Sequence, residues 1–459
     1  MRGKFVLGAG ALLIGGLALA VLTPDGASAD RLRQRDQLGA QGWVLPGAAL
    51  DLNFSQGQYF GGKSGCRAVA TCLNVVRASA GTAQDSAGNV VSFASGQPRV
   101  TNQGLLVEES RTNSQPYNEM AGAAAGSPGA MPTGWSYAQS GGLAFSVAAI
   151  GTENGLPYFD LNIAGSAAGS GLFNINFNTN NTAIAASNGQ IWTGSWFWRV
   201  SAGSTSTLSG CTYYIDIYNS SGSFLSQLGT AISMPIATAL GLGRAQGTET
   251  LANASTAYVN HFLSCAWTGA QTINVTLRFG PAQLEQGQGA TSLIYTNGAA
   301  VTRQADFITV ANPPAFGQAV TAYVPATPEL PATYGTTQTS LQIDEGDNLQ
   351  RIDLDRGSGS GQLSGGITSN NTAWGAPSAG IWPQNTQWPV AYALQTNDQA
   401  MGYAGSLSTY GGTTEMFTPA RIVLGSNGNG VHQLDGTIAR LAIWPTTRQP
   451  NAFLQQITP

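Results

Sequence analysis

The feature that most constrains this fold is a series of short apolar runs, rich in β-branched and aromatic residues, between clusters of Gly, Asn, Ser and Thr. Clear examples are Trp192–Val200, Thr212–Tyr218, Thr272–Phe279 and Ala391–Leu394. Runs of this length between turn-forming residues are typical of antiparallel strands. Helical periodicity is nearly absent and predicts only brief peripheral helices at Arg31–Gly39 and Asn451–Ile457. The sequence therefore predicts an all-β protein built from antiparallel β-sandwiches.

The run from Trp192 to Val200 indicates how such a strand builds a core. Its apolar residues of even number are Trp192, Trp196, Trp198 and Val200. Alternate residues of a strand share one face, so the three indole rings lie on the same side of the sheet. A row of tryptophans can also bind sugars, but inside a hydrophobic strand it is more often packing. We assign this face to the core.

Composition excludes one class of partner and bounds the number of domains. Only 9% of the residues are charged, against about 25% in a usual soluble protein, so folding must depend on apolar burial and backbone pairing. The net charge is -4, and no cluster of Lys or Arg coincides with an aromatic stripe. Nucleic acid is therefore not an expected partner. A chain of 459 residues predicts two or three domains.

The N-terminus predicts export. Arg2 and Lys4 precede an apolar run from Phe5 to Leu22, and small residues lie just before Asp30. This pattern is typical of a signal peptide covering residues 1–29, and an uncleaved membrane anchor is the alternative. No other segment is apolar enough to span a bilayer, so no membrane partner is expected after cleavage. The predicted location is extracellular, at a cell surface or on the surface of a virion or other particle.

Four cysteines in an exported chain predict disulfides, and three pairings are open to them. Cys66 and Cys72 bracket a loop that a bridge would staple, whereas Cys211 and Cys265 both lie in strand-like runs. We therefore predict the bridges Cys66–Cys72 and Cys211–Cys265. Free buried thiols are the alternative.

One segment resembles a signature of phage tail and head-spike fibre proteins. It is the string Gly-Leu-Leu-Val-Glu-Glu-Ser-Arg-Thr-Asn over residues 104–113. Similar landmarks precede it at Leu50–Phe54, Arg77–Ser79 and Asp85–Val90, and follow it at Gln283–Gly287, Ala290–Ser292 and Ala300–Asp306. The resemblance implies a carbohydrate-binding-module-like jelly roll over residues 113–303, preceded by a small β-rich region over residues 30–112. It also implies a homotrimer on a particle surface.

The C-terminal part resembles a concanavalin A-like lectin/glucanase domain. The landmarks are Arg421–Gly425, Leu434–Gly436 and Ile438–Pro445. The resemblance implies a lectin domain over residues 304–459, and the Pro-rich passage Asn312–Pro331 is interpreted as a joining segment or edge strand next to a boundary near Thr302. Particle fibres do not normally carry a signal peptide, so a secreted or envelope-anchored bacterial relative is the other reading.

The sequence predicts no catalytic centre, metal site or cofactor. His261 and His432 accompany no Gly-x-Ser-x-Gly motif, so a serine hydrolase lacks its base. Isolated histidines and paired cysteines cannot hold zinc, and calcium at Asp344 or Asp347 is the one cofactor that remains conceivable.

Asp353 and Asp355 are the carboxylates with the most interesting spacing. Alternation places them on one strand face roughly 7 Å apart, which is similar to a glycosidase pair. Flanking Arg351 and Arg356 favour surface ion pairs instead. Glu108 and Glu109 are adjacent and therefore point to opposite sides of a strand.

Glycan binding needs an aromatic ring to stack on a sugar and amide or carboxylate groups to bond its hydroxyls. Such residues gather in Gly-, Pro- and Asn-rich sequence of the last domain. The predicted glycan-binding residues are Trp374, Trp382, Trp388, Asn370, Asn371, Tyr403 and Tyr410. A small core within the loops, or a subunit contact, is the alternative.

These patterns predict a non-catalytic surface or fibre protein that binds cell-surface or extracellular polysaccharide and mediates adhesion or host recognition. The alternative is a purely structural spike or matrix subunit. A third reading is a polysaccharide hydrolase that uses Asp353 and Asp355.

Overall fold

A computed structural model describes residues 42–63 and 65–459. Every strand described below belongs to one compact unit, Gly47–Pro459. The paired strands are antiparallel, which confirms the predicted all-β fold. None of the described helices is long and apolar enough to cross a membrane. The predicted signal peptide and the predicted helix Arg31–Gly39 lie outside the described residues.

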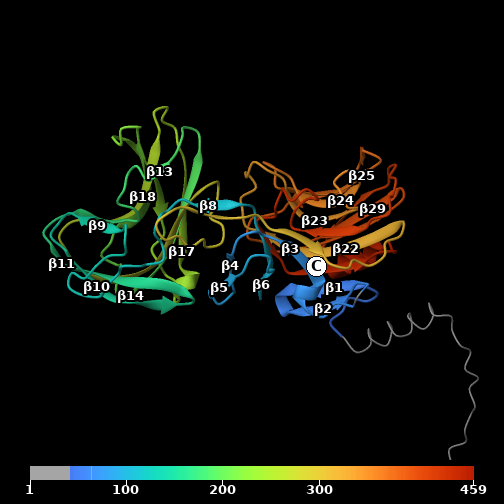
Figure 1. The fold of residues 1–459 in the computed structure, drawn as a ribbon, viewed down its shortest axis with the longest axis horizontal. Helices are drawn as coiled ribbons and strands as arrows, with labels where there is room; N and C mark the ends of the chain where they lie inside the picture. The colour runs from blue at the N-terminus through green and yellow to red at the C-terminus, as the bar shows by residue number, and fades with distance from the viewer. Residues whose placement is uncertain (1–41, 64) are drawn as a thin grey trace, which may run out of the picture. The chain divides into compact units, whose positions relative to one another are not determined.

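The middle of the chain forms one two-layer sandwich (Figure 1). Its five-stranded sheet has the spatial order β10 (Ala144–Glu153), β11 (Leu156–Ala167), β19 (Gln271–Gln286), β14 (Ile191–Gly203) and β17 (Arg244–Thr250). Its six-stranded sheet has the order β16 (Phe224–Ile232), β15 (Gly210–Tyr218), β18 (Tyr258–Trp267), β12 (Gly171–Asn176) and β9 (Ser136–Gln139), with β13 (Ile184–Ala185) also paired to β18.

The tryptophans of β14 fill the space between these two sheets, as predicted. Trp192, Trp196 and Trp198 are all buried and belong to one apolar cluster with strands of the facing sheet. The Trp196 ring stacks on Tyr213 of β15 with a centroid distance of 5.4 Å. Apolar burial on this scale stabilises a domain by about 25 cal/mol for each Å² removed from water. This face is therefore structural.

The second sandwich has a ten-stranded and an eight-stranded sheet. The ten-stranded sheet follows the order β2 (Gln58–Gly61), β1 (Leu50–Asn53), β33 (Arg440–Trp444), β22 (Ala319–Pro328), β28 (Trp388–Gln395), β29 (Asp398–Tyr403) and β30 (Ser406–Tyr410), and β32 (Gly436–Ile438), β7 (Gly104–Val107) and β6 (Arg99–Thr101) branch from it. The other follows the order β26 (Thr372–Trp374), β25 (Gln362–Ser369), β24 (Arg351–Arg356), β23 (Gln338–Asp344), β31 (Arg421–Leu424), β21 (Phe307–Val310) and β3 (Leu73–Val76), with β27 (Ser378–Ile381) paired to β25.

The remaining elements are small. Two-stranded sheets join β8 (Arg111–Asn113) to β20 (Val301–Arg303) and β4 (Gly81–Gln84) to β5 (Val90–Phe93). The helices are α2 (Val69–Cys72) and α3 (Asn451–Ile457), with 3-10 turns η1 (Phe54–Gln56) and η2 (Leu240–Leu242). The helix α3 matches the predicted one residue for residue.

Strands from both ends of the described chain share the second sandwich. Figure 1 shows the blue strand β1 beside the red C-terminal strands, and β1 pairs along its length with β33. Strand β3 likewise pairs with β21, and β7 with β32. Leu50 and Leu52 enter the same apolar core as the C-terminal strands. The domain boundaries at 112 and 303 stay a prediction, but the segment before residue 112 contributes strands to sheets that the C-terminal residues complete.

The Pro-rich passage contains an interior strand, which differs from the prediction of a joining segment or edge strand. Strand β22 lies between β33 and β28. Pro325 has no N–H to donate, but its carbonyl accepts a hydrogen bond from the backbone N–H of Ala439 at 2.8 Å. Opposite Pro325, strand β28 also carries a proline, Pro389. Prolines are tolerated here because they face each other where the ladder asks for no donor.

Both predicted disulfides are present. Cys66 and Cys72 have their Cα atoms 5.2 Å apart, and Cys211 lies directly opposite Cys265 on paired strands. Structural disulfides persist in oxidising compartments, so the two bridges fit an extracellular protein.

Candidate functional site

Trp382 does not offer its ring to a ligand, and its assignment to a glycan platform is wrong. The side chain is fully buried, and it belongs to the apolar core of the second sandwich. Its indole Nε1–H donates to the carbonyl of Thr386 at 3.0 Å. A large ring in a Pro-flanked loop gains more from burial than from exposure, so the loop folds its tryptophan inward.

The other predicted platform residues separate into two groups. Trp388 and Tyr403 are half-buried and continue a row from Trp382, with ring centroids 6.4 Å and then 5.9 Å apart. Trp374 and Tyr410 are also half-buried, and the Tyr410 ring lies against the residue next to Trp374. We call Trp382, Trp388 and Tyr403 the aromatic row.

The two predicted asparagines form a turn. Asn370 and Asn371 have positive φ angles of 50° and 59° between β25 and β26. Asparagine tolerates this left-handed backbone and is favoured in tight hairpins. The Asn370 amide donates to Glu415 at 3.1 Å. Their conformation is therefore explained by the hairpin.

Asp353 and Asp355 share one face of β24, as predicted. Asp353 accepts from Arg351 at 2.9 Å, and Asp355 accepts from the Thr339 hydroxyl at 2.7 Å. Burial first, and then the negative charge of Asp353, raise the pKa of Asp355 to about 8. Neither carboxylate lines any of four well-formed cavities in the described residues, three of which are described below. The ion pair expected at Arg351 is present. The one expected at Arg356 is not found among the described residues, because that side chain is buried and donates to Trp382, Leu330 and Gln338 instead.

Asp344 and His261, which were considered for calcium binding and for base chemistry, both have protein partners. Both oxygens of Asp344 accept from the Arg421 guanidinium, at 2.7 and 2.9 Å. Within the described part of the chain, no three His, Cys, Asp or Glu side chains gather as metal ligands. His261 is buried, which lowers its pKa to about 3, and its ring contacts Gln115 and Tyr213. A neutral core histidine of this kind has no access to substrate.

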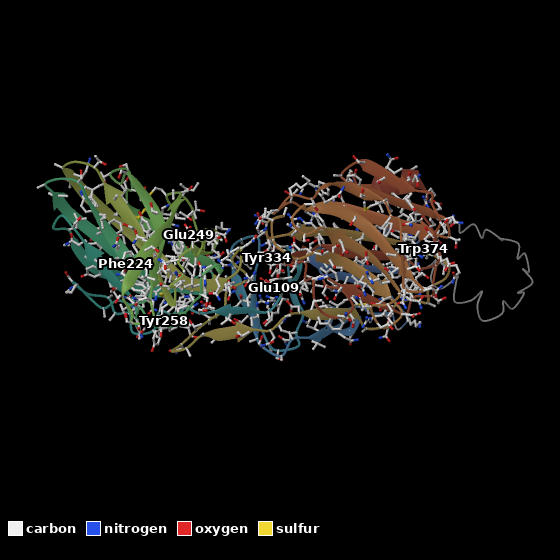
Figure 2. The ribbon with its side chains drawn as sticks, turned by 90° about the horizontal axis from the view of Figure 1, so that it is seen from above. Glu109, Phe224, Glu249, Tyr258, Tyr334 and Trp374 are labelled. Carbon is white, nitrogen blue, oxygen red and sulfur yellow. A yellow bond between two sulfur atoms is a disulfide. The ribbon has the colours of Figure 1, made fainter. Side chains whose placement is uncertain are left out.

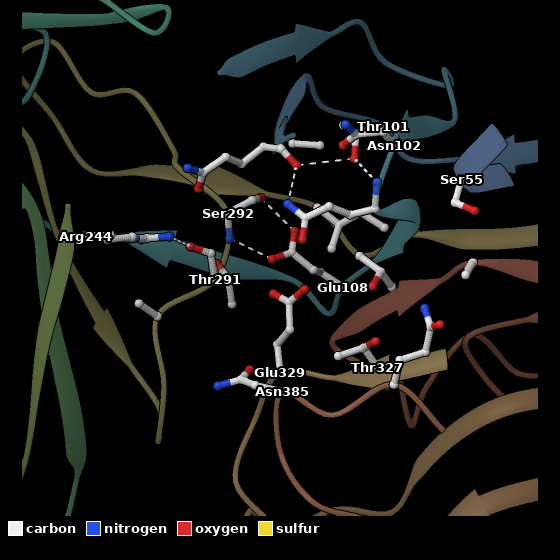
Figure 3. A pocket seen from close by; sticks show the side chains of 18 of the residues that line it. Ser55, Thr101, Asn102, Glu108, Arg244, Thr291, Ser292, Thr327, Glu329 and Asn385 are labelled. Atoms are coloured by element: carbon white, nitrogen blue, oxygen red, sulfur yellow. Dashed lines mark hydrogen bonds between the residues drawn. The ribbon is translucent and has the colours of Figure 1, made fainter. Parts of the chain in front are cut away.

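A polar cleft of about 650 Å³ lies between the β4, β6 and β7 region and the loops that follow β19 and β22 (Figure 3). We call it the polar cleft. Most of its lining side chains carry hydroxyl, amide or carboxylate groups: Ser55, Gln56, Gln84, Thr101, Asn102, Gln103, Glu108, Thr291, Ser292, Thr327, Glu329, Asn385, Gln387 and Thr437.

Two carboxylates face each other in the polar cleft (Figure 3). Glu108 accepts from the backbone N–H and the hydroxyl of Ser292, both at 2.6 Å. Burial opposes its charge, but the guanidinium groups of Arg303 and Arg99 lower the pKa of Glu108 to about 2. Glu329 is exposed to the solvent of the cleft and makes no side-chain hydrogen bond or ion pair with the described residues. Desolvation by the protein around the cleft, and then the negative charge of Glu108, raise the pKa of Glu329 to about 7.

A second open groove, of about 750 Å³, lies on the other side of residues 108–112. We call it the Tyr334 groove. Figure 2 shows Glu109 and Tyr334 close together. The other lining residues are Ser110, Arg111, Thr112, Ser114, Asn188, Gly189, Gln190, Ile191, Trp192, Gln286, Gly287, Gln288 and Gly335.

One ionic cluster forms the floor of the Tyr334 groove. The Arg111 Nε pairs with Glu109 at 2.5 Å, and the Tyr334 hydroxyl donates to the same carboxylate. The Arg111 guanidinium also lies 5.8 Å from the centroid of the Tyr334 ring. Burial and the neighbouring Glu109 raise the pKa of the Tyr334 hydroxyl, so it stays protonated as a donor. The ring is half-exposed and held in one orientation by these contacts.

Amide groups line the opposite rim of the Tyr334 groove. Asn188 and Gln286 are exposed, and within the described residues their side-chain amides have no protein partner. Gln190 is partly occupied, because its carbonyl accepts from the Trp192 indole at 3.1 Å. The groove thus combines a fixed aromatic ring, a carboxylate, a guanidinium and free amides.

The sequence prediction missed these residues. It treated Glu108 and Glu109 only as opposed neighbours, and Arg111 only as part of a family string. In a chain with so few charges, three ionisable residues within four positions were a usable signal. Nothing in the sequence indicated Tyr334, which is 225 residues from its partner Glu109.

No family model and no curated protein match this chain. Among solved structures it is similar to the Ruminococcus gnavus IT-sialidase CBM40 bound to α2,3 sialyllactose, at 13% identity over 31% of this chain and 83% of that one, with a TM-score of 0.27. It is also similar to the mouse laminin α1 chain domains LG4-5, at 9% identity over 56% and 82% and a TM-score of 0.21. Truncated AlyQ with CBM32 and alginate lyase domains gives 10% identity over 67% and 97%, with a TM-score of 0.21. A likeness of this size assigns neither a ligand nor an activity to this chain.

Proposed function

We propose that this protein is a non-catalytic glycan-binding protein and that polysaccharide binds in the Tyr334 groove. The observation that carries the proposal is the half-exposed Tyr334 ring beside the Glu109–Arg111 ion pair in an open groove. An aromatic face covers the apolar face of a sugar ring, and charged groups and amides bond its hydroxyls. An open groove also leaves room for the neighbouring sugars of a polymer.

The ion pair suits a neutral hydroxyl-rich ligand. Glu109 and Arg111 cancel each other's charge, so the groove needs no ionic ligand to be electrostatically satisfied. The carboxylate oxygens of Glu109 can still accept from sugar hydroxyls, and such charged hydrogen bonds are stronger than neutral ones. Asn188 and Gln286 add amides that both donate and accept.

A polysaccharide hydrolase is the second candidate, because Glu329 and Glu108 face each other with pKa values pushed apart. Two neighbouring carboxyl groups with widely different pKa values are typical of a general acid paired with a nucleophile or base. The oxygens of Glu108, however, accept hydrogen bonds from Ser292 and Arg99, so no free carboxylate remains for the second role. Asp353 and Asp355 likewise accept hydrogen bonds from Arg351 and Thr339, and they line neither the polar cleft nor the Tyr334 groove. We therefore favour binding without cleavage.

The wider role that we propose is adhesion or host recognition by an exported or particle-borne protein, with a homotrimer as the expected assembly. A purely structural spike subunit is the alternative. Sedimentation of the purified protein would test the trimer, and burial of Tyr334 between subunits would favour the structural role.

A panel of bacterial surface polysaccharides tests the binding proposal. The full chain and the variant Tyr334→Ala are each mixed with immobilised polymer, and the amount of bound protein is measured. We expect at least one polymer to retain the natural chain and to retain far less of the variant. The size distribution of that polymer after long incubation tests the other half. Shortened chains would establish cleavage, and equal retention of both proteins would exclude the Tyr334 groove.

A further inference from the structure

Five ionisable side chains form a buried cluster behind the polar cleft. Arg77 pairs with Asp306 at 2.8 Å, and Arg99 pairs with both Asp306 and Glu108, at 2.5 Å for the latter. Arg303 reaches Glu108 only at 3.4 Å. All five side chains are at most 3% exposed. Three guanidinium groups therefore share two carboxylates, and all five side chains are almost completely buried.

Arg303 is the member of this cluster whose hydrogen-bonding capacity is unused. Its Nε, Nη1 and Nη2 atoms are buried, and none has a hydrogen-bond partner in the described residues. The nearby oxygens are already taken, because Glu108 accepts from Arg99 and Ser292. The next carboxylate, Glu285, accepts from the backbone N–H and hydroxyl of Thr291, at 2.9 and 2.6 Å.

Buried donors in native proteins almost always have a partner. For a guanidinium that partner has to satisfy both the N–H groups and the positive charge. Water satisfies the N–H groups but leaves the charge, whereas an anion satisfies both. The unused donors of Arg303 therefore point to an anionic ligand.

Arg303 lines a cavity of about 180 Å³, which gives that ligand a place. The wall is part apolar and part hydroxylated: Ser79, Ala80, Gly81, Thr82, Ser92, Leu293, Ile294, Tyr295, Val301 and Thr302. Val301 is 41% exposed, so it lies where the cavity meets solvent. A volume of this size admits a small organic acid or a single sugar ring. We call it the Arg303 pocket.

We propose that the Arg303 pocket binds a small carboxylate, with the carboxylate on the Arg303 guanidinium and the organic part against Leu293, Ile294 and Val301. A planar carboxylate matches the fork of a guanidinium with two parallel hydrogen bonds. The ligand is either a free short-chain acid or the carboxylate of an acidic sugar. The Arg303 pocket shares no residue with the Tyr334 groove. Carboxylate binding in this pocket can therefore be tested independently of the proposed glycan binding.

Calorimetric titration of the full chain tests the proposal with four probes. Propionate and glucuronate carry the carboxylate, whereas propionamide and glucose are their neutral counterparts. We expect binding of one or both carboxylates and none of either neutral probe. Propionate alone would indicate a free acid, and glucuronate alone an acidic sugar. Absence of any carboxylate binding at about 50 mM would overturn the proposal, since that concentration detects even very weak complexes.

Two variants place the binding in the Arg303 pocket. Arg303→Lys keeps the charge but loses the planar fork, and we expect it to weaken binding about tenfold. Because a change in a buried cluster can impair folding, Val301→Trp is the second variant: it fills the mouth of the pocket and leaves the cluster intact. Thermal unfolding of both variants identifies a folding defect. Carboxylate binding by a folded Val301→Trp variant at natural affinity would contradict the assignment.

Discussion

The aromatic row and the Tyr334 groove use aromatic rings in opposite ways. In the row, Trp382, Trp388 and Tyr403 stack on one another, and the row starts from a fully buried ring. In the groove, Tyr334 contacts an ion pair and keeps part of its ring open. The comparison teaches that in a charge-poor chain most large rings are needed for the core. The few charged side chains are then the better indicators of a binding surface.

The largest expected effect is on the stability of the aromatic row. Trp382→Ala removes a fully buried ring and leaves a cavity, so we expect the free energy of unfolding to fall by about 3–5 kcal/mol. Trp388→Ala, at a half-buried position, is the matched control and should cost less. Urea unfolding of both variants measures the difference. Equal losses would show that the row is not anchored at Trp382.

The next effect is on glycan affinity in the groove. Tyr334→Ala removes the ring that we place against the sugar, and we expect affinity to fall about 10- to 100-fold, as for a central aromatic contact. The free energy of unfolding should change little, because the side chain is half-exposed. Titration calorimetry with a bound polysaccharide measures the affinity. A loss of the same size in Trp388→Ala would reverse the comparison.

A smaller effect separates the ring from its hydroxyl. Tyr334→Phe keeps the stacking face but removes the hydrogen bond to Glu109. One hydrogen bond contributes about 0.5–1.5 kcal/mol. Because this bond orients the ring before the ligand binds, we expect affinity to fall by at most about tenfold. The same titration, run beside Tyr334→Ala, gives the two contributions. If Phe and Ala are equally weak, the hydroxyl and not the ring is essential.

The smallest expected effect concerns the polar cleft and its pH dependence. The pKa of Glu329 is raised from its ordinary 4.5 to about 7. Between these values the folded protein binds more protons than the unfolded chain, so this group lowers stability as the pH rises. The side chain is exposed, so the effect is modest.

The variant Glu329→Gln cannot titrate at this position. We therefore expect it to become more stable relative to the natural chain as the pH rises from 4.5 to 7, as measured by urea unfolding at several pH values. A constant difference across this range would show that Glu329 keeps an ordinary pKa.

Local patterns predicted the fold well. The alternation of Trp192, Trp196 and Trp198 gave the buried face of β14, and the strand-like runs around Cys211 and Cys265 gave a correct disulfide. Pairing between distant segments was not predicted, because a strand such as β1 carries no mark of its partner β33. Periodicity records which face is buried but not which strand lies beside it.

The candidate site was predicted less well for a related reason. The tryptophans of residues 374–388 were judged by their Gly- and Pro-rich surroundings, which indicate loops but not exposure. Burial of Trp382 depends on strands far away in sequence. Glu109 and Tyr334 likewise meet only because the chain folds back over more than two hundred residues.

Hydrogen–deuterium exchange with a bound oligosaccharide tests the central claim most directly. Backbone amides at the binding surface exchange more slowly when the ligand covers them. Our account predicts slower exchange at residues 109–112, 114, 188–192, 286–288 and 334–335, which line the Tyr334 groove. Protection confined to residues 374–388 and 403–410, with none in the groove, would contradict it.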